Sequence, residues 1–323
     1  MITLYDIQGT GLARREGRVD ARPETLWIDL INPTPEEDAF VEGQLGIPIP
    51  TRAETREIEA SNRLYQENGA HYMTAFIVYN AEALLPSTST VTFILTRDRL
   101  VTVRYSEPKA FPLFLARVDK GDLPCQSAPA ILMGLIESII HRAADLIERI
   151  QDEVEKTAQS VFSIKGGQQT RGRRLDALLR SAGKEGDIVS RAQESAFSID
   201  RLLTYFTAAV KDRRDDAALL PRIETAHRDV HSLMEHLRFQ TNRITFLLDA
   251  TLGMINIEQN GIIKIFSVAS VALMPPTLIA SIYGMNFKRM PELEWLWGYP
   301  MAVALMVLSA IIPFIYFRRK GWF

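Results

Sequence analysis

The chain has 323 residues, of which 24% are charged and 47% hydrophobic, and its formal net charge is −2. A net charge so close to zero argues against a general nucleic-acid-binding protein, which needs a basic excess or a basic stripe. The single cysteine, Cys125, excludes an intramolecular disulfide framework and a cysteine-rich metal site, and agrees with a reducing compartment. The near-zero mean hydropathy hides two unlike parts, because residues 1–260 are highly charged and the C-terminal tail is strongly apolar.

Residues 1–125 have the pattern of a mixed α/β domain. A short apolar run, Trp27 to Ile31, predicts a strand that ends at Asn32-Pro33. The next residues predict the start of a helix, with Thr34 as N-cap, proline at the first helical position and Glu37 completing a capping box.

Two further strand pairs are predicted in the same domain. Asn68-Gly69 is a strong hairpin signal between the runs Arg63 to Gln66 and His71 to Tyr79. Val91 to Leu95 and Leu100 to Tyr105 form the second pair.

Residues 126–221 are predicted to form a helical hairpin, because apolar residues recur at helical spacing over Ile131 to Val161 and again over Leu175 to Val210. From Arg222 the helical pattern continues without interruption toward the C-terminus. Four apolar residues then repeat every seven positions: Ile223, Val230, Leu237 and Ile244.

Residues 222–283 are interpreted as one long helix, an oligomeric stalk that continues into a membrane span. Such a helix would be on the order of 90 Å long at about 1.5 Å per residue, which is too long for one small domain to surround. The alternative is two helices that break near Asn256 to Asn260.

Two apolar runs of 19 residues, Ile265 to Tyr283 and Tyr299 to Phe317, carry no charge. Each is long enough to cross a hydrocarbon core of roughly 30 Å. They predict a first span, an external loop at 284–298, a second span at 299–317 and a basic tail at 318–323. Arg318-Arg319-Lys320 should stay inside the cell, and the N-terminus lacks a signal peptide, so both termini are predicted to be cytoplasmic.

The loop between the spans opens with Tyr283-Gly284-Met285-Asn286-Phe287 and continues with Met290-Pro291-Glu292-Leu293. In this position the two segments closely resemble the signature of the CorA family of magnesium transporters. The resemblance extends upstream through Met254 to Asn260 and Met274 to Thr277, and downstream through Tyr316 to Trp322.

This resemblance implies a homopentamer in the cytoplasmic membrane, with the first span of each subunit lining a pore and the second packed outside it. An α/β domain and the stalk helices would form a cytoplasmic funnel. The motif asparagine of the family forms a ring at the outer mouth that holds a hydrated magnesium ion, and Asn286 is the matching residue. Alignment through the motif places four residues at pore-facing positions: Thr277, Met274, Phe266 and Asp249.

The chemistry of these residues suits that role. Magnesium releases its waters reluctantly, so a selective mouth does better to grip the hydration shell. Amide oxygens of Asn286 can accept hydrogen bonds from bound waters, whereas a carboxylate ring would bind more strongly and release more slowly. Gly284 allows close backbone approach at the negative end of the helix dipole. The plain alternative is a helix C-terminus with a capping asparagine.

The deeper positions have plain alternatives as well. Rings of Phe266 and Met274 could close a pore by dewetting, or these side chains could simply pack against lipid or the second span. A ring of Asp249 could concentrate cations, or the residue could lie on a solvated stalk surface. In the loop, Glu292 and Glu294, beside Lys288-Arg289, are expected to tune ion attraction.

No nucleotide-binding loop of the Gly-x-x-x-x-Gly-Lys type occurs, so the expected driving force is the membrane potential, worth roughly twice 2.3 kcal/mol per 100 mV for a divalent ion. The family brakes uptake with internal magnesium bound at acidic positions between neighbouring cytoplasmic domains. Glu224 and Asp229 are the candidates here, or Asp212, Asp215 and Asp216, although acidic runs are usually solvated surfaces.

The sequence is therefore interpreted as a channel-like transporter, not an enzyme, that admits hydrated magnesium, with cobalt and nickel as further substrates. Its expected partners are membrane lipid, divalent cations and further copies of itself, with no nucleic acid and no organic cofactor. One alternative is a zinc-transporting member of the same superfamily. Another is a membrane-anchored scaffold that passes no ions.

Overall fold

The computed structural model describes all residues except 10, 58, 60, 61, 81–85, 124, 164–167, 213–217, 287–289, 292–294 and 323, and it leaves the side chains of 168–171 undescribed. The chain divides into two compact units. The first comprises Met1–Ser163 with Arg180–Leu248, and the second comprises Ile164–Leu179 with Asp249–Phe323.

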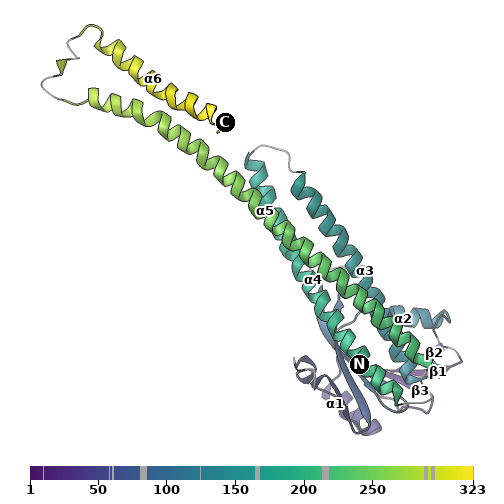
Figure 1. Ribbon diagram of the computed structural model, residues 1–323. Helices are drawn as coiled ribbons and strands as arrows, with labels where there is room; N and C mark the ends of the chain where they lie inside the picture. Colours follow the sequence, from purple (N-terminus) through teal and green to yellow (C-terminus); the bar gives the residue numbers. More distant parts are fainter. Residues whose placement is uncertain are drawn as a thin grey trace. The chain divides into compact units, whose positions relative to one another are not determined.

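A seven-stranded mixed sheet forms the N-terminal part of the first unit (Figure 1). Its strands run in the order β2-β1-β3-β7-β6-β5-β4, and only β3 and β7 pair in parallel among the described strands. The strands are β1 (Ile2–Gln8), β2 (Gly11–Glu16), β3 (Thr25–Ile31), β4 (Leu64–Glu67), β5 (Ala70–Tyr79), β6 (Ser87–Leu95) and β7 (Leu100–Arg104).

The sequence predicted several of these elements closely. Helix α1 (Pro35–Leu45) begins with the complete capping box, in which Glu37 N donates to Thr34 Oγ1 and Thr34 N donates to the Glu37 carboxylate. The β4–β5 turn uses Asn68 at φ 49° and Gly69 at φ 77°, the left-handed conformation that an Asn-Gly hairpin requires. The strands β1 and β2 and the helix α2 (Ala110–Asp119) were not predicted.

An aromatic cluster fills the core between the sheet and the helices. Trp27 is fully buried, stacks on Tyr5 with ring centroids 4.2 Å apart, and donates from Nε1 to Thr102 Oγ1 at 2.9 Å. Phe114 of α2 meets the Trp27 indole edge-on at 5.8 Å. A Cβ at Gly134 would lie only 2.6 Å from the Phe114 ring, so glycine is what allows the next helix to approach α2.

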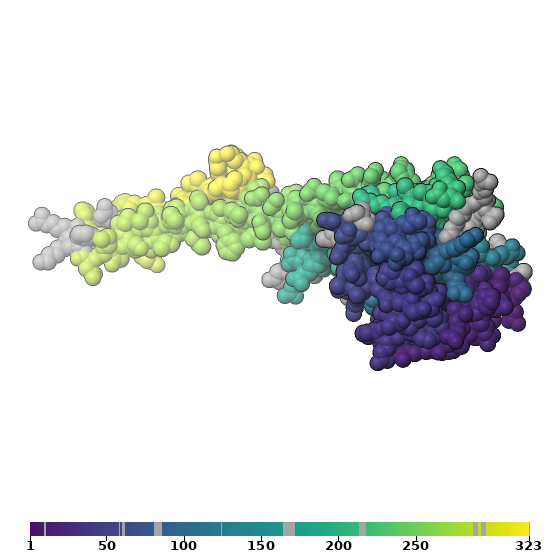
Figure 2. Space-filling view, turned by 90° about the horizontal axis from the view of Figure 1, so that it is seen from below, coloured from purple at the N-terminus to yellow at the C-terminus, as the bar shows by residue number. Residues whose placement is uncertain are grey.

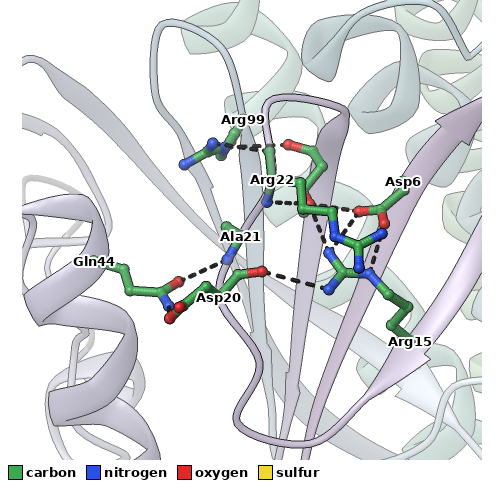
Figure 3. Close-up of polar contacts among 8 residues, drawn as sticks. Asp6, Arg15, Asp20, Ala21, Arg22, Gln44 and Arg99 are labelled. Atoms are coloured by element: carbon green, nitrogen blue, oxygen red, sulfur yellow. Dashed lines mark hydrogen bonds and ion pairs between the residues drawn. The ribbon is translucent and has the colours of Figure 1, made fainter.

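A network of hydrogen bonds holds the loop before β3 near the β2 edge of the sheet (Figure 3). Arg15 Nε donates to Asp6 Oδ2 at 2.6 Å, and this bond is the main reason that the pKa of Asp6 is lowered. The Arg99 guanidinium donates to the carbonyls of Arg22 and Thr25. The loop before β3 is therefore tied to β1, β2 and the β6–β7 turn.

Long helices follow the sheet: α3 (Ala128–Phe162), α4 (Gln168–Lys211), α5 (Leu220–Tyr283) and α6 (Gly298–Arg319). In the first unit, α3 and α4 lie beside α5 (Figure 1). Gln193 on α4 donates to Thr241 on α5, and Arg243 on α5 is paired with Glu155 on α3.

Helix α5 is continuous, and its apolar repeat is buried within the chain. The helix is continuous through Asn256 to Asn260, so the alternative of a break there is wrong. The seven-residue repeat Ile223, Val230, Leu237 and Ile244 is buried within the single chain, with Ile244 facing Gly186 of α4. This apolar repeat thus packs against the chain's own helices and does not by itself indicate an oligomer.

Candidate functional site

The segment Gly284-Met285-Asn286 lies directly after the last turn of α5. Gly284 N donates to Ala280 O at 2.9 Å, and Met285 N donates to Ile282 O at 3.3 Å, so the helix ends in a tightened turn. A Cβ on Gly284 would lie 3.1 Å from Ala280 O, which makes this position tight for any larger residue. The carbonyls of the last turn form the negative end of the helix dipole beside Asn286.

Met285 and Asn286 project from this turn as exposed residues, Met285 with 49% of its surface accessible. The loop residues Glu292 and Glu294, together with Lys288 and Arg289, lie outside the described residues.

The other predicted pore residues are exposed on one stripe of α5. Phe266 and Met274 each have 70% of their surface accessible, and Asp249 and Thr277 are exposed as well. At about 100° per residue, all four fall within an arc of about 100° on an ideal helix. Thr277 Oγ1 donates to Leu273 O at 2.7 Å, which satisfies the hydroxyl within its own helix.

Further polar residues, which were not predicted, lie on the same stripe as Thr277. Within the run Ile265 to Tyr283 the serines and threonines are Ser267, Ser270, Thr277 and Ser281. Their positions share an arc of about 80° on an ideal helix, inside the stripe. Upstream, the exposed Asn256 and Gln259 continue it. The signal was their spacing of three, four, seven and eleven residues, which could have been read from the sequence.

The opposite side of α5 is apolar and more covered. In both views α6 lies along the C-terminal part of α5 (Figure 1 and Figure 2). Val268 on α5 and Ala302 on α6 are buried, and Ala272 and Ile279 are half-buried. Both α5 and α6 contain a stretch long and apolar enough to cross a membrane. The first of these helices is therefore apolar on one side and lined with hydroxyls on the other.

The candidate regulatory acids are separate from this stripe. Glu224 and Asp229 lie near the start of α5 and are both exposed. Asp229 lines an open pocket with Glu137, whose carboxylate is already paired with Arg222 at 2.8 Å. Asp212 is exposed, whereas Asp215 and Asp216 are outside the described residues. Among the described residues, no three His, Cys, Asp or Glu side chains gather in a way that could hold a metal ion.

A family model for CorA-like Mg2+ transporter proteins matches residues 23–319 of the chain. The chain belongs to the CorA family. The magnesium transport protein CorA of Yersinia pseudotuberculosis is 36% identical over 323 residues, and that of Escherichia coli K12 is 34% identical over 324 residues; each alignment covers 100% of both chains.

Solved structures agree on the fold. The CorA magnesium transporter from Methanocaldococcus jannaschii superposes with a TM-score of 0.78 at 18% identity, covering 100% of this chain and 99% of that one. The full-length CmaX protein gives a TM-score of 0.68 at 17% identity, covering 99% and 98%. The predicted architecture of an N-terminal sheet domain, a long helix and two C-terminal apolar helices is thereby confirmed.

Membership in the CorA family makes this chain a transport protein of the magnesium-transporter class rather than an enzyme. The curated relatives named above are magnesium transport proteins, so a zinc-transporting function is not favoured.

Proposed function

We propose that this CorA-family protein is a membrane channel that takes up hydrated magnesium through a pore lined by α5. The observation that carries the proposal is the stripe on α5: every serine and threonine hydroxyl of the first apolar run shares one side with Asp249, and the helix ends at Tyr283, just before Gly284-Met285-Asn286. Serine and threonine are enriched where the helices of a membrane bundle face one another. A stripe of them is what a pore-lining helix needs.

The proposed assembly is a homopentamer in the cytoplasmic membrane, with both termini in the cytoplasm. Residues 1–125 would form the cytoplasmic α/β domain, 126–221 the helical hairpin and 222–283 the stalk and first span. Residues 284–298 would be the external loop, 299–317 the second span and 318–323 the basic tail. The basic residues Arg318 to Lys320 after the second span support this orientation.

At the outer mouth, a ring of Asn286 would hold the hydration shell of the ion, since magnesium keeps its waters. Gly284 and Met285 set the turn that positions Asn286. Below the mouth, Thr277 would offer a hydroxyl ring, while Met274 and Phe266 would form apolar constrictions that can close by dewetting. Asp249 would concentrate cations at the inner end, and Glu292 and Glu294 would attract them outside.

The proposed driving force is the inside-negative membrane potential, and the proposed brake is internal magnesium. Glu224 and Asp229 would bind that regulatory ion between neighbouring subunits. Cobalt and nickel, as small divalent ions, are the proposed secondary substrates.

The experiment is flux into proteoliposomes that contain the purified protein, under an inside-negative potential, with magnesium and zinc compared at equal concentration. Magnesium entry that exceeds zinc entry is the expected result. Zinc entry alone would support the zinc-transporting alternative, and entry of neither ion would support the scaffold alternative. Empty liposomes and liposomes without a potential are the controls.

A further inference from the structure

The C-terminal end of α6 is built as a specific turn rather than a frayed helix end. Gly321 adopts φ +71°, Gly321 N donates to Arg318 O at 3.1 Å, and Trp322 N donates to Phe317 O at 3.1 Å. These are the two hydrogen bonds of a Schellman motif. The apolar contact that often accompanies the motif is also present, since the Trp322 and Phe317 rings have centroids 4.8 Å apart.

This turn brings Trp322 to the other apolar helix of the second unit. Lys264 Nζ lies 5.8 Å from the centre of the Trp322 ring. Lys264 is the residue immediately before the apolar run of α5, and Arg318 is the residue immediately after the apolar run of α6. The apolar runs of α5 and α6 are therefore flanked by basic residues at the end where the α5 run begins and the α6 run stops. The cation–π contact between Lys264 and Trp322 joins the two helices there.

Four cations gather at this end, and we call them the basic collar: Lys264, Arg318, Arg319 and Lys320. The three on α6 and its cap are exposed, as is Lys264. Between Lys264 and Trp322 the only acidic residues of the sequence are Glu292 and Glu294, in the loop that joins the opposite ends of the two runs. The chain therefore supplies the collar with no carboxylate from this segment.

We propose that the basic collar binds the phosphate headgroup of an anionic phospholipid from the bilayer that surrounds the protein. Clusters of Lys and Arg directly beside a membrane span attract anionic lipids, and guanidinium groups pair well with phosphate oxygens. The indole of Trp322 and the phenol of Tyr316, which Lys320 Nζ approaches at 5.4 Å, are side chains suited to the headgroup level. The lipid phosphate would act as a counterion for these cations.

This inference rests on the proposed function only in that α5 and α6 must cross a bilayer. The position favours a lipid over a soluble anion, because the collar begins where both apolar runs stop.

The test is native mass spectrometry of the full-length protein after incubation in detergent with equimolar phosphatidylglycerol and phosphatidylcholine. Wild-type protein should retain phosphatidylglycerol preferentially. The variant R318Q/R319Q should retain at least about fivefold less, since each interfacial cation adds attraction for anionic lipid. Trp322→Leu keeps all four charges and an apolar contact but loses the cation–π partner, and it should show a smaller loss.

A matched control, R228Q/R238Q, removes two exposed charges from the part of α5 in the first unit and should retain lipid as the wild type does. Equal retention by R318Q/R319Q, or an equal loss in the control, would overturn the proposal. Displacement of the lipid by millimolar inorganic phosphate would overturn it in favour of a free-anion site. If R318Q/R319Q does not assemble, the single variant R319Q, which removes one charge, is compared with R318K/R319K, which keeps both charges. R319Q should then retain less phosphatidylglycerol than R318K/R319K.

Failure of this inference is distinguishable from failure of the proposed function. Protein that does not float with vesicles on a density gradient contradicts the bilayer crossing itself. Protein that floats but shows no preference for anionic lipid contradicts only the lipid site.

Discussion

Glu185 of α4 accepts a hydrogen bond of 2.7 Å from Thr157 Oγ1 of α3, in the interior of the helical part of the first unit. Ser181 donates a second bond to the same oxygen at 3.1 Å. The other carboxylate oxygen, Oε2, is buried without a hydrogen-bond partner among the described residues. Burial raises the pKa of Glu185, and the nearby Glu153 raises it further, against the hydrogen bonds and Lys184.

We predict that Glu185 makes the folded protein less stable as the pH rises. Because its pKa is raised on folding, the folded state binds the proton more tightly than the unfolded state does. Stability is therefore greatest below the ordinary glutamate pKa and falls as the pH rises through the raised pKa. Glu185→Gln should remove this pH dependence. At pH 8 the variant should be more stable than the wild type by on the order of 1–3 kcal/mol, and the gain should be smaller at pH 5.

The measurement is the thermal-unfolding midpoint of the full-length protein in detergent, at pH 5 and pH 8. Glu148→Gln is the matched control, since Glu148 is an exposed glutamate of α3 and is not among the charges that shift the pKa of Glu185. A Glu185→Gln variant that follows the wild-type pH dependence would contradict this account.

The buried ion pair between Asp29 on β3 and Arg104 on β7 should be sensitive to removal of one partner. Arg104 Nη2 lies 2.8 Å from Asp29 Oδ2, Thr102 Oγ1 donates to Asp29 Oδ1 at 2.6 Å, and the Arg104 guanidinium lies over the Phe111 ring. Asp29→Ala leaves a buried guanidinium uncompensated and should cost about 3–5 kcal/mol. Asp145→Ala, which breaks a more exposed pair with Arg142, should cost less than about 0.5 kcal/mol by the same thermal assay.

Asn286→Ala should abolish magnesium uptake while the oligomer still forms, because the substitution removes the amide oxygen proposed to hold the hydration shell. Asn286→Asp should bind the ion more strongly and pass it more slowly. Proteoliposome flux measures both effects, and gel filtration in detergent checks assembly. Uptake at the wild-type rate in Asn286→Ala would remove this residue from its proposed role.

Asp249→Asn should lower magnesium uptake most at low ionic strength. The proposed ring of carboxylates concentrates cations through a field that salt screens, with a Debye length of about 30 Å at 0.01 M and 8 Å at 0.15 M. Glu258→Gln changes the same charge on the opposite side of α5 and serves as the control, since its position on an ideal helix is about 180° from that of Asp249. An equal effect of both variants, or an effect unchanged by salt, would argue against a pore position for Asp249.

Much of the fold could be predicted because its signals are local. The capping box at Thr34 and Glu37 and the Asn68-Gly69 hairpin each depend on a few adjacent residues. The parallel pairing of β3 with β7 joins residues about 75 positions apart, as Asp29 and Arg104 are, and no local pattern encodes it. It places a charged pair where two apolar strands were expected.

Other elements were missed although the sequence carried a signal for them. Helix α2 buries Phe111, Phe114 and Val118, which have the three- and four-residue spacing of a helix side. Gly9 follows β1 and Gly11 begins β2, a spacing that indicates a turn, but β2 is rich in arginine and does not resemble a core strand. Burial of Glu185 could not be predicted, because an acidic residue in a helix usually faces solvent and only the packing of α3 against α4 decides otherwise.

The hydroxyl side of α5 also bears on how subunits come together. A single copy in the bilayer would turn Ser270 and Ser281 toward lipid tails, together with Thr277, whose hydroxyl already donates to Leu273 O within the helix. Joining other copies around water removes that penalty without requiring any tight contact between the stripes. Assembly of the proposed channel would then be favoured by the polar surface that each subunit withdraws from the lipid.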